Sequence, residues 1–175
     1  LANMNMGIGK TKKASKAKNR KWKSKDWDNE TPTKEYFDEL FRVSKNQIIW
    51  GGNYFDLPPC KKFIMWDKEI PDGLSFSDCE MAWTSFKNGA KIYNKTATQL
   101  NRIHPTQKPI GLYDWLIDRY AEKGQIILDT HLGSGSSRIS ANKAGLSFVG
   151  CEIDKDYFNA QEKRYKEFVS QTRLF

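Results

Sequence analysis

Apolar residues recur along the chain with spacings that alternate between those of helices and those of strands. Between residues 34 and 43 the apolar side chains fall on one helical face, and the Thr-Pro-Thr stretch before them can cap this helix. Short apolar runs at 46–50, 62–66 and 80–86 predict strands. Residues 87–102 are polar and have no clear period, so we expect them to be irregular.

The alternation is clearer in the second half of the chain. The pattern predicts a helix over residues 109–123, a strand at 125–129, a helix at 136–143 and a strand at 147–152. Asp154 can then cap a last helix, which carries four aromatic residues. Strands that alternate with helices predict an α/β protein whose sheet is mainly parallel.

The stretch ILDTHLGSGSS, residues 127–137, joins a buried strand to a glycine-rich loop and a helix. Glycines allow a tight turn and the close approach of a ligand, and Glu152, about 20 residues further on, stands where an acid can bind ribose hydroxyls. Asp129 before the loop disfavours a phosphate and favours a cationic ligand, which indicates S-adenosyl-L-methionine. The glycines alone also fit a structural turn, but the loop and Glu152 together favour a nucleoside site.

The chain of 175 residues carries a net charge of +8, which suits a polyanionic partner. Its basic residues are concentrated near the start, in a run that contains no acid and has a tryptophan inside it. The run fits equally a solvated tail and a loop that contacts DNA phosphates while tryptophan stacks on a base. The candidate DNA-binding residues are Lys10, Lys12, Lys13, Lys16, Lys18, Arg20, Lys21, Lys23 and Lys25.

The remaining composition excludes several classes of protein. No apolar run approaches the roughly 20 residues of a membrane span, and no secretory signal pattern opens the chain. Cys60, Cys79 and Cys151 lie far apart and form no CxxC pair, so we expect neither a metal site nor a disulfide framework. These features are typical of a cytoplasmic protein with reduced cysteines.

Two segments resemble motifs of one enzyme family. The stretch DTHLGSGSS, residues 129–137, resembles the cofactor loop of amino-methylating DNA methyltransferases, usually DPFxGSGTT, and HPTQKP, residues 104–109, resembles a segment that precedes this loop in the same family. Their order resembles that of the permuted beta group, especially its small, phage-associated members. The resemblance implies a Rossmann-like S-adenosylmethionine-dependent methyltransferase fold, circularly permuted, with helices on both faces of a mainly parallel sheet.

The same resemblance implies a methyl transfer from S-adenosyl-L-methionine to adenine N6, favoured over cytosine N4, in DNA. Glu152 would bind the ribose and Ile153 would pack near the adenine, while Lys108 could meet the cofactor carboxylate. His131 stands where the family usually has phenylalanine, so a shielding role is favoured over that of a catalytic base. His104 is expected to fix its loop by hydrogen bonding. The implied cofactor-binding residues are Thr106, Gln107, Lys108, Asp129, His131, Gly133, Ser134, Gly135, Ser136, Glu152 and Ile153.

The family's catalytic tetrapeptide, (D/N/S)PP(Y/F), does not occur in the 175 residues. In the family it would hold the target amine and stack on the flipped base. The nearest match, DLPPC at residues 56–60, has the wrong spacing, and we interpret it as a loop between strands. We therefore expect the catalytic motif to lie upstream of Leu1. An inactive fragment that binds cofactor and DNA, and a methyltransferase acting on RNA or protein, are the alternatives.

The expected organisation is a single methyltransferase domain, 1–175. It divides into a basic mobile loop at 1–30, a catalytic-side half at 31–86, an irregular segment at 87–103 that could contact DNA, and a cofactor-binding half at 104–175. The expected partner is double-stranded DNA, with no membrane. The sequence leaves open a homodimer, a partner restriction endonuclease, and a bacterial or phage-encoded origin.

Overall fold

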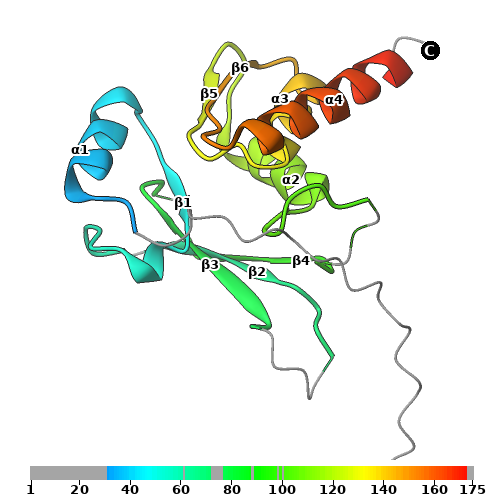
Figure 1. Ribbon diagram of the computed structural model, residues 1–175. Helices are drawn as coiled ribbons and strands as arrows, with labels where there is room; N and C mark the ends of the chain where they lie inside the picture. Colours follow the sequence, from blue (N-terminus) through cyan, green and yellow to red (C-terminus); the bar gives the residue numbers. More distant parts are fainter. Residues whose placement is uncertain are drawn as a thin grey trace, which may run out of the picture.

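The computed structural model describes residues 31–60, 62–71, 77–87, 89–97, 99 and 101–172. In Figure 1 the helix and strands of residues 34–94 form one part of the molecule, and the helices and strands of residues 110–172 form the other. The elements in chain order are α1 (Lys34–Val43), β1 (Ile48–Trp50), the 3-10 helix η1 (Gly52–Tyr54), β2 (Phe63–Asp67), β3 (Cys79–Thr84), β4 (Lys91–Asn94), α2 (Ile110–Tyr120), β5 (Ile126–Asp129), α3 (Ser136–Lys143), β6 (Ser147–Gly150) and α4 (Lys155–Thr172).

The strands form two sheets among the described residues. The larger sheet has the order β1-β3-β2-β4, and β5 pairs with β6 in a second sheet. Strand β3 is antiparallel to both β1 and β2, whereas β4 is parallel to β2, and β6 is parallel to β5. The expectation of one mainly parallel sheet is therefore wrong for the larger sheet. The link between Asp67 and Cys79 is too short for the crossover that a parallel pair needs, so β2 and β3 run antiparallel.

Helices cover both faces of the larger sheet, as expected. Successive strand residues point to opposite faces, so Ala82 and Trp83 of β3 face different layers. On the Ala82 face, Ile64 and Trp66 of β2 pack with Leu112 and Leu116 of α2 in the buried core. On the other face, Trp83 meets Phe41 of α1, with ring centroids 5.7 Å apart. The two helices thus hold the sheet between them.

The segment expected to be irregular contains a strand. Residues 91–94 form β4, whose Ile92 pairs with Met65 of β2 at the edge of the larger sheet. Only Tyr93 of this strand packs against the core, and Ile92 is 68% exposed, so the segment lacks the repeated apolar positions from which a strand is recognised in sequence. The prediction of an irregular 87–102 is therefore wrong at these four positions.

The second sheet has one apolar face without cover among the described residues. Ile126 and Leu128 of β5 are 66% and 38% exposed, and Val149 of β6 is 53% exposed. These side chains share one face, because Leu128 lies opposite Val149 in the register. Strand β5 pairs only with β6 in the described part of the chain.

The predicted helix boundaries hold closely at the glycine loop and less closely elsewhere. Helix α3 begins and ends where expected, and Asp154 caps α4 by accepting hydrogen bonds from the N–H groups of Asp156 (2.9 Å) and Tyr157 (3.1 Å). Helix α2 ends at Tyr120, before the expected residue 123. None of the described helices is long and apolar enough to cross a membrane.

Candidate functional site

The glycine loop leaves the carboxyl end of β5 and leads into α3. Gly133 and Gly135 adopt left-handed backbone conformations, with φ of 52° and 69°. The N–H of Leu132 donates to the Cys151 carbonyl beyond β6 (2.9 Å), and the N–H of Gly135 donates to the Leu132 carbonyl (2.9 Å). The loop is therefore a fixed turn at the end of two parallel strands, the place where open α/β sheets bind ligands.

Two carboxylates hold this turn. Asp129, the last residue of β5, accepts hydrogen bonds from the N–H of His131 (3.0 Å) and from the Ser137 hydroxyl. Glu152 follows β6 and accepts from the N–H groups of Gly133 (2.7 Å) and Asp154 (2.9 Å). Each carboxylate oxygen keeps a second lone pair, so both groups can still accept from ammonium or hydroxyl donors of a ligand.

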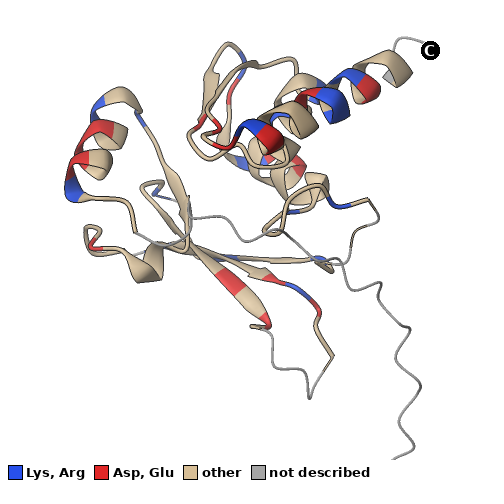
Figure 2. Cartoon of the chain, viewed as in Figure 1, with Lys and Arg blue, Asp and Glu red and all other residues tan. Residues whose placement is uncertain are grey.

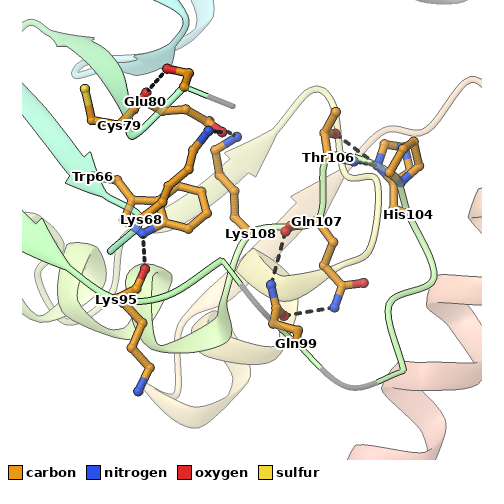
Figure 3. Close-up of polar contacts among 12 residues, drawn as sticks. Trp66, Lys68, Cys79, Glu80, Lys95, Gln99, His104, Thr106, Gln107 and Lys108 are labelled. Carbon is orange, nitrogen blue, oxygen red and sulfur yellow. Dashed lines mark hydrogen bonds and ion pairs between the residues drawn. The ribbon is translucent and has the colours of Figure 1, made fainter. Parts of the chain in front are cut away.

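The HPTQKP segment, residues 104–109, packs against the glycine loop. An added Cβ at Gly133 would stand 3.5 Å from the His104 ring, and the Ser136 hydroxyl donates to the Lys108 carbonyl (2.9 Å). His104 Nδ1 accepts a hydrogen bond from the N–H of Thr106 (3.3 Å), and it lies 3.0 Å from the Thr106 hydroxyl (Figure 3). The prediction that His104 fixes its loop by hydrogen bonding is confirmed.

A pair of glutamines continues this network. The Gln107 amide donates to Gln99 Oε1 (3.0 Å), and the Gln99 amide donates to the Gln107 carbonyl (3.1 Å), as Figure 3 shows. Gln107 Oε1 also accepts from the N–H of Ile103 (3.0 Å). Gln107 is 5% exposed, so its role in this structure is to shape the segment.

The side chain of Lys108 points away from the loop toward the larger sheet. Its ammonium lies 2.8 Å from Glu80 Oε2 of β3 and 5.2 Å from the ring centroid of Trp50. Figure 3 shows Lys108 and Lys68 converging on Glu80. Sequence reasoning did not single out Glu80, because an acid in a strand gives no signal of its partner.

His131 contacts helix α1 through a tyrosine that sequence reasoning assigned only to an apolar face. The Tyr36 hydroxyl lies 2.7 Å from the Thr130 hydroxyl and 3.5 Å from His131 Nδ1, and the Tyr36 and His131 rings meet edge to face. Burial raises the pKa of the Tyr36 phenol, although the Thr130 hydrogen bond opposes this rise. Tyr36 thus joins the first described helix to the loop.

The serines of the loop are buried and meet a second residue that sequence reasoning missed. Ser134 and Ser136 are 5% and 2% exposed, and their hydroxyls lie 3.2 Å apart. Arg164 of α4 donates to the Ser134 carbonyl (2.7 Å) and to the Ser136 hydroxyl (3.0 Å). Ile153, in contrast, is 89% exposed, which leaves its side chain open to a ligand surface.

Two other sequence predictions have different outcomes. Residues 56–59 form a loop, as predicted, and the Trp83 indole donates to the Pro58 carbonyl (2.8 Å). The basic residues from Lys10 to Lys25 lie outside the described residues, so their contact with DNA stays a prediction. Figure 2 shows acidic and basic residues interspersed along α4, so this helix has no basic run like that of residues 10–25.

His104 makes the stability of the fold depend on pH. Burial lowers the pKa of its imidazole, although the Glu152 carboxylate opposes this shift. As the pH falls below the ordinary value of about 6.5, the unfolded chain binds the proton first, so the stability that neutral His104 contributes is lost toward lower pH. We expect His104→Gln to flatten the fall in the free energy of unfolding between about pH 7 and pH 5. Urea denaturation across this range measures it, and equal slopes for variant and wild type would contradict the assignment.

Comparisons with known proteins agree with this geometry. The family described as DNA methylases (N6/N4) matches residues 4–163. A type II methyltransferase of Streptococcus pneumoniae, M2.DpnII, is 29% identical over 140 residues, which cover 79% of this chain and 48% of that protein. The type II methyltransferase M2.MboI of Moraxella bovis is 26% identical over 148 residues, covering 82% and 49%. The chain therefore spans about half the length of these curated relatives.

A solved structure shares the fold. The complex of M1.HpyAVI with SAM, S-adenosylmethionine, aligns with a TM-score of 0.53 at 22% identity and covers 75% of this chain and 68% of that one. The Rossmann-like α/β methyltransferase fold expected from the resemblance is thereby confirmed, although β3 of the larger sheet runs antiparallel to its neighbours. Because the family match extends over most of the sequence, including both the HPTQKP segment and the glycine loop, the chain belongs to the N6/N4 DNA methylase family.

Proposed function

We propose that this chain belongs to an enzyme that transfers a methyl group from S-adenosyl-L-methionine to the exocyclic amine of adenine (N6) or cytosine (N4) in DNA. One observation carries the proposal: the two carboxylates at the ends of β5 and β6 hold a glycine turn, and the HPTQKP segment packs against that turn. The names of the relatives, type II methyltransferases, and of the solved M1.HpyAVI–SAM complex support it.

The donor and acceptor groups of the site fit this cofactor. Asp129 offers a negative charge beside a bare turn, which suits the ammonium and sulfonium of the methionine end. Glu152 offers acceptors for two ribose hydroxyls. The exposed Ile153 offers apolar surface for the adenine. Thr106 and His131 border the turn, where they would limit the access of water.

When bound, the cofactor supplies an electrophilic methyl group. The residues of this chain would bind and orient it, and such chemistry depends mainly on positioning. The residues that hold the target amine are unassigned, because the family's (D/N/S)PP(Y/F) tetrapeptide does not occur in the 175 residues. This observation favours a second candidate function for the chain by itself: binding of cofactor and DNA without methyl transfer.

The substrate proposal is double-stranded DNA. The basic run from Lys10 to Lys25 would contact phosphates, and residues 87–103 would lie near the bases. In this proposal residues 1–175 act as one domain, with the catalytic side at 31–86 and the cofactor side at 104–175. The activity would be exerted on DNA in the cytoplasm, and a homodimer or a partner endonuclease is compatible with it.

Methyl transfer from tritium-labelled S-adenosyl-L-methionine tests the proposal. The 175-residue chain is incubated with DNA, RNA or protein, and labelled nucleosides are separated to distinguish N6-methyladenine from N4-methylcytosine. Label that appears in DNA alone supports the proposed DNA methyltransferase activity. Saturable cofactor binding without transfer supports the second candidate, whereas label in RNA or protein contradicts both DNA proposals.

A further inference from the structure

Glu80 of β3 lies between two lysines from different parts of the chain. Its Oε1 is 3.0 Å from the Lys68 ammonium, and its Oε2 is 2.8 Å from the Lys108 ammonium. The two lysine side chains are 15% and 14% exposed, and the Glu80 side chain is 35% exposed. These pairs are more sheltered than the ion pair of Lys34 with Asp38 on α1, whose side chains are 81% and 61% exposed.

The surroundings of Lys108 favour a fixed ammonium. The ring centroids of Trp50 and Trp66 lie 5.2 Å and 6.0 Å from its Nζ, within the range of cation–π attraction. Burial by itself raises the pKa of Glu80, but the charges and hydrogen bonds of Lys108 and Lys68 outweigh it, so the pKa is lowered. Glu80 therefore stays ionised and keeps both lysines paired at neutral pH.

Lys108 connects two parts of the molecule through different groups. Its ammonium binds Glu80 in the larger sheet, while its backbone carbonyl accepts from the Ser136 hydroxyl at the start of α3. The path Glu80–Lys108–Ser136 therefore runs from β3, through the HPTQKP segment, to α3, the helix that follows the glycine loop. In Figure 3, Lys108 is the residue of this segment that reaches Glu80, and His104 lies at the far side of the segment from the sheet.

We propose that Glu80 is a positioning residue for the cofactor: by pairing with Lys108 it holds the HPTQKP segment in the conformation that closes on the methionine end of S-adenosyl-L-methionine. This inference rests on the proposed function. Glu80 lies in β3, so a strand of the larger sheet would influence cofactor binding at the ends of β5 and β6. Glu80 acts through Lys108 and does not itself touch the cofactor.

The exchange Glu80→Gln keeps the size and hydrogen-bonding capacity of the side chain and removes its charge. We expect it to weaken S-adenosyl-L-methionine binding by about tenfold, a typical strength of coupling between sites. Binding of 5′-methylthioadenosine, which lacks the amino-acid part of the cofactor, should change less than about twofold. If Glu80→Gln only damaged the fold, the affinities for both ligands would fall equally. Isothermal titration calorimetry with the two ligands therefore separates a positioning role of Glu80 from a structural one.

The other ion pair of Glu80 provides a matched control. Lys68→Met removes the second lysine but leaves the HPTQKP segment and its pair intact, and it should keep wild-type affinity for both ligands. Lys108→Met should lower the affinity for S-adenosyl-L-methionine as much as Glu80→Gln does. The variant that carries both changes should bind no more weakly than either single variant, because all three lose the same interaction.

The outcomes are distinguishable from a failure of the proposed function. If the wild-type chain binds no S-adenosyl-L-methionine, the proposed function and this inference are both overturned. If the wild type binds but Glu80→Gln binds equally well, or loses both ligands equally, only the role of Glu80 is overturned. Additive losses in the double variant would also contradict it.

Discussion

Replacing Asp129 by alanine should lower the affinity for S-adenosyl-L-methionine by about 100-fold, because a charge-assisted hydrogen bond to the ammonium of the methionine end is lost. In the structure the Asp129 carboxylate is fixed by the N–H of His131 and the Ser137 hydroxyl, so its direction at the end of β5 is set before a ligand binds. Because the carboxylate is already fixed, little conformational entropy is lost when the ligand binds, so removing this acceptor should lower the affinity strongly. Equilibrium dialysis with labelled cofactor measures the loss.

A conservative exchange separates the charge of Asp129 from its hydrogen bonds within the loop. Asp129→Asn keeps an oxygen for the N–H of His131 but removes the negative charge, and we expect it to lose most of the affinity while circular dichroism shows the wild-type fold. Asp118→Asn, on the exposed surface of α2, controls for a change in net charge. Wild-type affinity in Asp129→Ala would refute the assigned pocket.

Replacing Gly135 by alanine should destabilise the chain by about 3 kcal/mol, combining left-handed backbone strain with overpacking. The φ of Gly135 is 69°, and an added Cβ would stand 3.0 Å from Gln161 Oε1 and 3.3 Å from Gln161 Cβ. Gln161 is 1% exposed and its Oε1 accepts from Arg138 (3.0 Å), so it has little room to move. Chemical denaturation measures the change in free energy of unfolding.

Gly145 provides the matched control for this prediction. Its φ of 67° is nearly the same, but an added Cβ would meet nothing within 4 Å. Gly145→Ala should therefore cost about 1 kcal/mol, the strain alone, and should leave cofactor binding unchanged. Equal costs for the two variants would show that close packing against α4 does not constrain the loop.

The second half of the chain was predictable because its signals are local. The strand, glycine turn and helix at 126–143 follow one another in sequence, and both glycines that the pattern singled out take positive φ values. Asp154 likewise caps α4 as its position indicates. Each of these features depends on neighbours a few residues away, which is the range over which sequence patterns carry information.

The features that sequence reasoning missed depend on distant partners. Glu80 meets Lys108, and Tyr36 meets Thr130, only because the two halves of the chain pack together. The antiparallel pairing of β2 with β3 and the exposed edge strand β4 are also decided by tertiary structure, since short apolar runs do not specify direction or order. The resemblance located the segments of the site but not the side chains that hold them.

A titration of the isotopically labelled chain with S-adenosyl-L-methionine, followed by amide chemical shifts, tests the central claim most directly. The account predicts saturable shifts at the amides of Gly133 and Gly135 and across residues 104–108 and 152–153, with little change on the far surface of α2. Saturable binding whose shifts avoid the glycine loop, or no binding at millimolar cofactor, about the weak limit for a specific site, would contradict it.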